Sequence, residues 1–419
     1  MMNESLWLDE STTALVSKMS LHDIFFKFLP NDFHPPLYYL LMKYWVSIFG
    51  NSEIFLRIPS LIFALLTIYV VYKAFGKLSA VLLASAPLLF YYAGEARMYT
   101  MAMFFVTSLV IYFRKITKKS SVGDWFIFSF LLSLVFLTDY VAALIIPALW
   151  VGAWLMRENL GWWKKFIMSH IILILGGVFW FPYLQKQLTN GLNVLITAPA
   201  WSEILGQTSF KNLALIPVKF MIGRVGFDNK LVYLLVIGFL SLLFTLLLYE
   251  GRKAGKVIWL WLIIPLTLAA ILSFRVSILT YFRFLFILPA FYILVSEGIK
   301  KLGKYAKPVT ALVLGINLAL IGYYLANTKF HREDWRAASK AIGDSQIVLP
   351  ANSQAEALTY YGKAGQIVKS PTGNTVWLSR YVTEIFDPKD LVRKNIEKLG
   401  YNKVSEYNFN GVVFWKYTK

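Results

Sequence analysis

The sequence predicts an all-α polytopic membrane bundle followed by a small C-terminal α/β domain. The 419-residue chain is 58% apolar, with a mean hydropathy of +0.57. Only 16% of its residues are charged, whereas about a quarter are charged in soluble domains. Long apolar runs dominate up to residue 328, after which the composition becomes that of a soluble domain.

The net charge and the cysteine content indicate further which class of protein this is. Lys and Arg outnumber Asp and Glu by 42 to 23, which gives a net charge of +19. Such an excess is typical of proteins that meet nucleic acid or the anionic face of a bilayer, and the apolar runs favour the bilayer. The chain has no cysteine, which excludes disulfides, thiolate metal sites and a cysteine nucleophile. We therefore expect membrane lipids, and no nucleic acid, among its partners.

Residues 1–53 are expected to form a first outer loop with interfacial helices. No charged stretch followed by an apolar run marks a signal peptide, and a transmembrane helix that should deliver this loop is expected to be missing because of a wrongly assigned start. The segment from His34 to Gly50 is apolar but short, and Lys43 would lie near the middle of the bilayer. Its prolines and its tyrosines predict a helix in the interface instead.

Residues 54–328 are expected to form a ten-helix transmembrane bundle. Most of the charge-free apolar stretches approach the roughly 20 residues that cross a bilayer, and the shorter ones can be completed by snorkelling side chains at their ends. The ten stretches are 58–72, 78–94, 98–113, 125–138, 140–156, 166–184, 231–249, 257–274, 285–296 and 309–327.

The distribution of basic residues orients this bundle. With the first stretch running inward, the inner turns hold sixteen Lys and Arg, and the short outer turns hold Arg97, Arg275 and Arg283. This asymmetry fits the positive-inside rule. We therefore expect a multi-pass protein of the cell membrane whose first loop, outer loop 185–230 and C-terminal domain are extracytoplasmic.

Residues 329–419 are expected to form the soluble α/β domain. The patterns "SQIVLPA", "GQIVKSP" and "GVVFWKY" indicate strands, and Asn410-Gly411 indicates a hairpin turn. "DPKDLVRKNIEKLG" predicts a helix with Asp387 as N-cap and Gly400 past its end, and "HREDWRAASKAI" predicts a solvated helix joining bundle and domain.

Carboxylates and arginines gather where the bundle meets the outer face. Sugar transfer from a lipid phosphate uses both, because a carboxylate takes the proton of the attacking hydroxyl and cations hold the departing phosphate. Arg suits the second role, since its charge is permanent and its fork matches phosphate oxygens. The outer-rim candidates are Asp9, Glu10, His34, Arg57, Glu95, Arg97, Tyr99, Asp139, Tyr140, Arg275, Tyr281 and Arg283.

The ordered motifs "LWLDESTTAL", "FHPPLYYLL", "FLRIPSLIFALL" and "YYAGEARMYTM" resemble those of the C-type glycosyltransferase superfamily. The similar branch contains the dolichyl-phosphate-mannose protein mannosyltransferases and the lipid A aminoarabinose transferase. The resemblance implies an inverting enzyme that moves a hexose or pentose from a polyprenyl-phosphate donor to a protein, glycan or lipid acceptor. It also implies that a residue placed like Asp9 is the base. Asp139 departs from the pattern, since many relatives offer a Lys or His there.

The residue types and the resemblance together give each candidate an expected role. Asp9 and Glu10 are expected to be catalytic, and Arg97, Arg283, Arg57 and His34 to bind the donor phosphate. Supporting positions are Glu95, Tyr99, Asp139 and Tyr140. No cofactor is expected, although adjacent carboxylates can also hold Mg²⁺ or Mn²⁺ together with a third ligand.

Plainer interpretations remain for several of these residues. Asp9 and Glu10 would also suit the N-terminus of a helix, where acids are stabilising. His34 before two prolines would also suit a turn, and Arg57 would also snorkel at a helix end. The alternative functions are a membrane transporter or lipid flippase without glycosyl transfer, and an inactive scaffold. A transporter predicts charges near the midplane, whereas the charges here gather at the outer rim.

Overall fold

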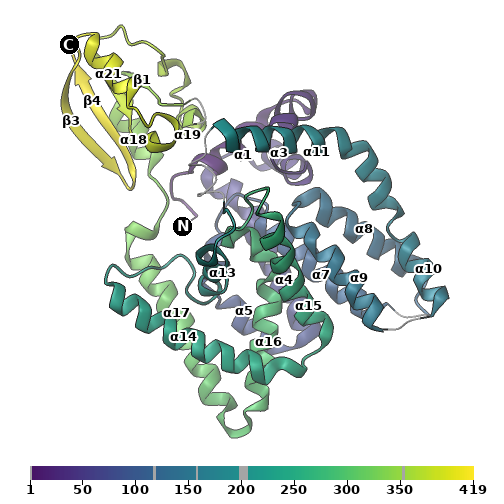
Figure 1. Ribbon diagram of the computed structural model, residues 1–419. Helices are drawn as coiled ribbons and strands as arrows, with labels where there is room; N and C mark the ends of the chain where they lie inside the picture. Colours follow the sequence, from purple (N-terminus) through teal and green to yellow (C-terminus); the bar gives the residue numbers. More distant parts are fainter. Residues whose placement is uncertain (1, 117–118, 157–158, 198–205, 352–353) are drawn as a thin grey trace.

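The computed structural model describes residues 2–116, 119–156, 159–197, 206–351 and 354–419. It consists of a large helical bundle and a small domain with a β-sheet beside it (Figure 1). The predicted fold class is confirmed.

The first residues form helices that lie across the end of the bundle. Helices α1 (Leu8–Lys18) and α3 (Leu37–Phe49) pack against each other, and α4 (Glu53–Phe75) follows. Gly50, with a φ of 83°, ends α3, and the hydroxyl of Ser52 caps α4 by accepting a hydrogen bond from Phe55 N at 3.5 Å. The predicted helix in the segment from His34 to Gly50 is therefore present, and it starts directly after the two prolines.

The bundle continues with twelve further α-helices among the described residues. They are α5 (Lys77–Ala84), α6 (Pro87–Tyr92), α7 (Tyr99–Lys115), α8 (Val122–Thr138), α9 (Ile145–Met156), α10 (Leu160–Met168), α11 (Ile171–Thr197), α13 (Phe210–Ile222), α14 (Lys230–Glu250), α15 (Lys256–Leu272), α16 (Leu288–Lys301) and α17 (Ala306–Ala326).

Within the described residues, five helical segments are long and apolar enough to cross a bilayer, so the chain is a multi-pass membrane protein. They are Glu53–Phe75, Leu160–Asn193, Lys230–Lys253, Tyr281–Lys301 and Gly303–Ala326. Three shorter apolar helices cover Val122–Thr138, Ala142–Met156 and Lys256–Leu272. The expected number of ten spans and the domain boundaries stay predictions.

Two of the expected stretches differ from the helices that form. Residues 78–94 do not make one helix but α5 and α6, because Pro87 lacks the N–H that a continuous helix needs and instead starts α6. The expected outer loop 185–230 is partly helical, since α11 extends to Thr197 and α13 covers Phe210–Ile222, which includes the whole apolar stretch 213–222. Residues 198–205 of this loop lie outside the described residues.

Helix α16 lies at the centre of the bundle, where it packs against α14, α15 and α5. A Cβ atom on Gly298 would lie 1.9 Å from Leu247 O, so only glycine allows this close approach to α14. The 3₁₀ segment η5 (Tyr281–Ile287) precedes α16 and carries Arg283.

The C-terminal domain contains a four-stranded sheet in the order β1-β2-β4-β3. The strands are β1 (Gln346–Val348), β2 (Thr375–Ser379), β3 (Asn402–Phe409) and β4 (Val412–Thr418), and the helices are α18 (Trp335–Ile342), α19 (Ala355–Tyr360), α20 (Thr383–Phe386) and α21 (Leu391–Lys398). β1 and β2 are parallel, and the other pairs are antiparallel. Asn410 and Gly411, with φ of 52° and 99°, form the predicted hairpin turn.

Three predictions for this domain were wrong in detail. "GQIVKSP" forms no strand, and only Ile367 makes an isolated bridge to β1. The helix predicted from His331 starts at Trp335, whose side chain is fully buried in the domain core, so this helix is not simply solvated. Helix α21 starts at Leu391 rather than at Pro388, although Asp387 still accepts hydrogen bonds from Leu391 N and Val392 N, at 2.8 and 2.9 Å.

The C-terminal domain docks on the N-terminal helix. Helix α19 packs against α1, and Leu8 joins the apolar cluster around Trp335 and Leu358. In Figure 1 the domain lies beside α1, close to the N-terminus of the chain. The residues that precede and begin α1 are therefore held between the bundle and the domain.

Candidate active site

The centre of the site is an ion pair between α1 and the loop before α7. Asp9 lies in the first turn of α1, and its side chain is 42% exposed. Its Oδ2 lies 3.6 Å from Nη2 of Arg97, which is only 4% exposed. Arg97 Nη1 also donates to the Asp9 carbonyl oxygen at 3.4 Å. A carboxylate that solvent can reach therefore lies beside a buried, permanent positive charge.

His34 extends this arrangement away from Asp9. Arg97 Nη2 donates to His34 Nε2 at 3.4 Å, and His34 Nδ1 lies 3.3 Å from Asp32 Oδ2. Because arginine can only donate, Nε2 of His34 accepts, and the ring proton on Nδ1 is donated to Asp32. Asp32, His34, Arg97 and Asp9 thus form one chain of polar contacts.

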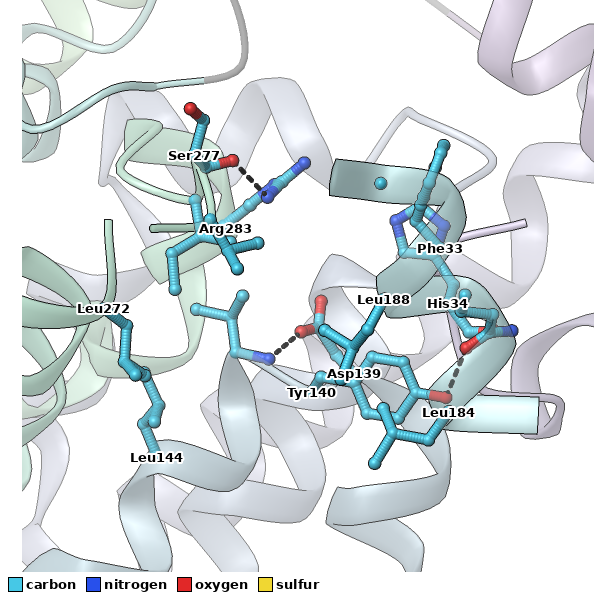
Figure 2. Close-up of a pocket in the computed structure, with 15 residues that line it drawn as sticks. Phe33, His34, Asp139, Tyr140, Leu144, Leu184, Leu188, Leu272, Ser277 and Arg283 are labelled. Carbon is cyan, nitrogen blue, oxygen red and sulfur yellow. Dashed lines mark hydrogen bonds between the residues drawn. The ribbon is translucent and has the colours of Figure 1, made fainter. Parts of the chain in front are cut away.

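An apolar cleft with a volume of about 280 Å³ opens next to His34. Figure 2 shows Arg283 and Ser277 on one side and Phe33 and His34 on the other. Arg283 donates from Nη1 to Ser277 O at 3.3 Å, and among the described residues no carboxylate pairs with it. A cleft with apolar walls and an arginine at its rim suits a ligand with a hydrocarbon chain and an anionic group.

Asp139 and Tyr140 line the cleft and also fix its wall. The buried carboxylate of Asp139 accepts hydrogen bonds from Val141 N at 2.7 Å and Ala142 N at 3.2 Å, as an N-cap does. Tyr140 donates to Gln187 Oε1 at 2.7 Å. An acid at position 139 therefore has a local structural task, which a cation could not perform.

Gln187 ties the cleft wall to the loop that carries His34. Its Nε2 donates to Leu29 O at 2.6 Å and to His34 O at 3.3 Å. Sequence reasoning missed Gln187, because a glutamine within an apolar helix carries no local signal for a partner more than 150 residues away.

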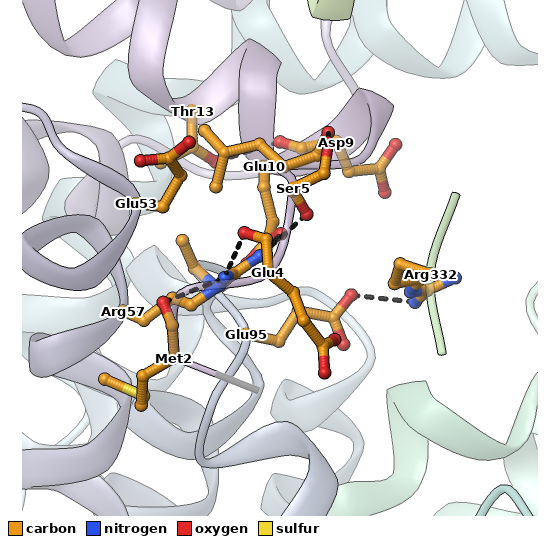
Figure 3. A network of polar contacts seen from close by, with 12 residues as sticks. Met2, Glu4, Ser5, Asp9, Glu10, Thr13, Glu53, Arg57, Glu95 and Arg332 are labelled. Atoms are coloured by element: carbon orange, nitrogen blue, oxygen red, sulfur yellow. Dashed lines mark hydrogen bonds and ion pairs between the residues drawn. The ribbon is translucent and has the colours of Figure 1, made fainter. Parts of the chain in front are cut away.

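Glu10 lies in a different environment from its neighbour Asp9. Its carboxylate accepts from Arg57 Nε at 2.8 Å, from Arg57 Nη2, and from Ala96 N at 2.8 Å. Glu10 and Arg57 are 1% and 3% exposed, respectively. Arg57 also donates to the carbonyl oxygens of Met2, Glu4 and Ser5, as Figure 3 shows in part.

Arg57 is not among the residues that line the cleft. The structure therefore does not bring Arg57 together with His34 and Arg283, as a shared phosphate site would require. Its guanidinium is surrounded by Glu10 and by backbone carbonyls of the first residues, because the helix end that carries it is covered by the start of the chain.

The remaining supporting residues lie behind Arg97. Glu95 is 3% exposed and accepts a hydrogen bond from Arg332 Nη2 at 2.8 Å. Burial raises the pKa of the Glu95 carboxyl above its usual value, and the charge of Arg332 opposes that rise. Tyr99 packs on Phe282, with ring centroids 5.3 Å apart. Arg332 lies in the connection to the C-terminal domain and was not foreseen as part of the site.

No group of three or more His, Asp or Glu side chains that would hold a metal ion is found among the described residues. Glu95 is paired with Arg332, and Asp139 is engaged by backbone N–H groups. Glu95 and Asp139, which could supply a third ligand beside Asp9 and Glu10, thus already have other partners. The expectation that no metal is needed stays a prediction.

These features define a polytopic membrane protein with a polar site beside an apolar cleft. The sequence profile of the family described as dolichyl-phosphate-mannose-protein mannosyltransferase matches residues 33–185, which is less than half of the chain. Comparison with curated protein sequences finds no significant match.

Similar solved structures extend over nearly the whole chain. ArnT from Cupriavidus metallidurans bound to undecaprenyl phosphate superposes with a TM-score of 0.55 at 15% identity, covering 99% of this chain and 94% of ArnT. ArnT in the apo state gives a TM-score of 0.54 at 14% identity, with the same coverage. The resemblance to the C-type superfamily is confirmed by the family profile and by this fold.

Proposed function

We propose that the protein is an integral-membrane inverting glycosyltransferase that moves a sugar from a polyprenyl-phosphate donor to an extracytoplasmic acceptor. The family profile over residues 33–185 and the fold shared with ArnT support this class. The ArnT structure was determined with undecaprenyl phosphate bound, which supports a polyprenyl phosphate as donor carrier here.

One observation carries the proposal. The exposed carboxylate of Asp9 lies 3.6 Å from Arg97, and Arg97 contacts His34 at the edge of the cleft that Arg283 also lines. Arg283 thus lines an apolar cleft, and the pair of Asp9 and Arg97 is joined to the edge of that cleft through His34. This is the set that transfer from a lipid phosphate needs, since the acceptor must lose a proton and the departing phosphate must be held.

The reaction proceeds as a displacement at the anomeric carbon. Asp9 takes the proton of the acceptor hydroxyl while the hydroxyl oxygen forms a bond to the anomeric carbon. The bond from that carbon to the phosphate oxygen breaks, and the electron pair leaves with the polyprenyl phosphate. Arg283 and Arg97 stabilise the leaving phosphate through charge-assisted hydrogen bonds. Attack opposite to the leaving group inverts the anomeric centre.

The other candidates take supporting roles in this proposal. Glu10 and Arg57 hold the start of α1 in place, and His34 orients Arg97 through its contact with Asp32. Asp139 and Tyr140 shape the cleft wall. Glu95 and Tyr99 pack behind Arg97.

The test of function uses purified protein with undecaprenyl-phosphate donors that carry a hexose or a pentose, and measures release of the lipid phosphate. We expect release with wild-type protein and no transfer with Asp9→Asn, although the variant unfolds at the same temperature. Asp228→Asn is the matched control, because Asp228 is 92% exposed and lies outside the cleft.

Retained activity of the Asp9→Asn variant would reject Asp9 as the base. Movement of the lipid-linked sugar across proteoliposomes without formation of a glycosidic bond would instead favour the transporter or flippase.

Sidedness has a direct test because the chain has no cysteine. The proposal puts the C-terminal domain outside and the turn around Lys256 inside. A membrane-impermeant maleimide added to intact cells should label Val404→Cys, at a position that is 60% exposed in β3, but not Lys256→Cys. The opposite labelling pattern would place the site on the cytoplasmic side.

A further inference from the structure

Arg332 connects the two loops that carry the candidate reacting groups. Its guanidinium carbon lies 3.6 Å from the ring centroid of Trp7, and its Nη2 donates to Glu95 Oε1 at 2.8 Å. Trp7 lies two residues before Asp9, and Glu95 lies two residues before Arg97. One side chain therefore contacts both segments whose relative position sets the distance between Asp9 and Arg97.

Helix α1 lacks a cap of its own at this point. Trp7 is its N-cap residue, and no side chain there accepts a hydrogen bond from the first turn. An N-cap side chain normally fixes where a helix begins. The start of α1 is instead held by contacts from outside the helix, of which the cation–π contact with Arg332 is one.

The C-terminal domain supplies further contacts to the same segment. The Tyr361 hydroxyl accepts a hydrogen bond from Leu6 N at 2.8 Å, and Arg336 N donates to Ser5 Oγ at 3.0 Å. Leu8 packs on the core of the domain. The residues directly before Asp9 are thus fixed to the C-terminal domain by polar and apolar contacts.

Arg332 is itself fixed by the domain. Asn410 Nδ2, in the hairpin turn, donates to Arg332 O at 2.8 Å. Loss of Arg332 would leave Glu95 buried without its cation, and a buried charge without a partner is unfavourable. Either Glu95 would then take up a proton, or the loop between α6 and α7 that carries Glu95 would move. Arg97 lies in the same loop.

We infer that Arg332 is a positioning residue that holds Asp9 beside Arg97, so that transfer depends on the docked C-terminal domain. This inference rests on the proposed function, in which Asp9 is the base. It assigns the domain a task at the reaction centre that is separate from any choice of acceptor.

The experiment compares Arg332→Gln with wild type in the lipid-phosphate release assay. We expect kcat to fall roughly 10- to 100-fold, because a displacement of about 1 Å at a reacting group costs up to that much. The stoichiometry of donor binding should stay unchanged, since Arg283 and the cleft are intact, and kcat should fall by a larger factor than the KM for donor rises. Arg332→Lys should recover most of the loss, because the ammonium keeps the charge. Arg393→Gln, which removes an ion-paired arginine elsewhere in the domain, should leave kcat unchanged.

A second readout does not need activity. Hydrogen exchange of the amides in residues 3–12 should become faster in Arg332→Gln, whereas exchange in the sheet of the C-terminal domain should not. Unchanged exchange in residues 3–12 would overturn the inference whether or not transfer is observed. Failure of the wild-type protein to transfer any sugar would instead reject the proposed function and the catalytic part of this inference.

Two other results would overturn the inference. The first is a wild-type kcat in Arg332→Gln. The second is a fall in kcat by the same factor as the fall in the stoichiometry of donor binding, because partial unfolding would lower both equally. If Arg332→Gln does not fold, Trp7→Leu replaces it, with Trp7→Phe as its control because phenylalanine keeps an aromatic face for the guanidinium. A folded Trp7→Leu variant with the wild-type kcat would then count against the inference.

Discussion

The buried ion pair between Glu10 and Arg57 allows a stability prediction that separates Glu10 from Asp9. Both side chains are almost fully buried, and the Glu10 carboxylate accepts from Arg57 Nε and Nη2 and from Ala96 N. Glu10→Gln keeps the shape of the side chain but loses the negative charge. An amide NH₂ in place of one carboxylate oxygen cannot accept a hydrogen bond, so the contact of Oε2 with Arg57 Nη2 cannot be kept together with those of Oε1. Arg57, itself buried, would then lose the carboxylate that binds it most closely.

We expect Glu10→Gln to lower the free energy of unfolding by about 3–5 kcal/mol, which is the usual cost of removing one partner of a buried pair. Replacing both residues by apolar side chains, Glu10→Leu with Arg57→Met, should recover much of this loss, because no unpaired charge remains. Part would stay lost, since Arg57 also donates to three carbonyl oxygens of the first residues.

The assay is unfolding in detergent, by heat and by denaturant, followed by tryptophan fluorescence. Glu406→Gln is the matched control, because Glu406 forms an exposed pair with Lys403 at 2.8 Å and such pairs contribute about 0–1 kcal/mol. If Glu10→Gln is destabilised no more than Glu406→Gln, or if the double variant is less stable than the single one, the reasoning from burial is refuted.

Three further outcomes are expected. Arg283→Ala should lower kcat/KM for the donor roughly 10- to 100-fold, the value of a charge-assisted hydrogen bond of about 1.5–3 kcal/mol, and an unchanged kcat/KM would remove Arg283 from the phosphate site. Asp139→Ala should lower the free energy of unfolding by about 1 kcal/mol through loss of a cap, while Asp139→Asn keeps an acceptor and should cost less, so equal losses would contradict the capping role. In α13, Lys219 donates to Val225 O at 3.2 Å, and burial lowers its pKa from 10.5 to about 8. The unfolded chain then binds more protons between these values, so wild-type stability should rise relative to Lys219→Met from about pH 8 to 10.5, and a flat difference would contradict this.

The helical membrane fold was predictable because it depends on local composition. Runs of apolar residues without charges identify membrane helices whatever their partners, and α14 and α17 follow the expected stretches closely. Asn410-Gly411 was equally predictable, since both residues need a positive φ that few other pairs adopt easily. Helix breaks were harder to predict, as the division of residues 78–94 at Pro87 shows.

The contacts of the candidate site were only partly predictable, because most join residues far apart in the chain. The ordered motifs drew attention to Asp9, His34 and Arg97, and the structure brings these three together. Nothing in the sequence around Arg57 shows that Glu10, 47 residues earlier, neutralises it. Nor does "HREDW" show that Arg332 reaches Trp7, since only the docked domain places it there.

The helical geometry of α1 explains why two adjacent acids take different roles. Successive side chains on a helix point about 100° apart, so Asp9 and Glu10 cannot face the same group. The Glu10 side chain is buried, and its carboxylate accepts hydrogen bonds from Arg57 and from Ala96 N. This fixes the rotation of α1 about its own axis and leaves Asp9 turned toward Arg97, partly exposed to solvent. In the proposed mechanism the buried acid therefore sets the direction in which the exposed acid points, and both are needed although only one touches the substrate.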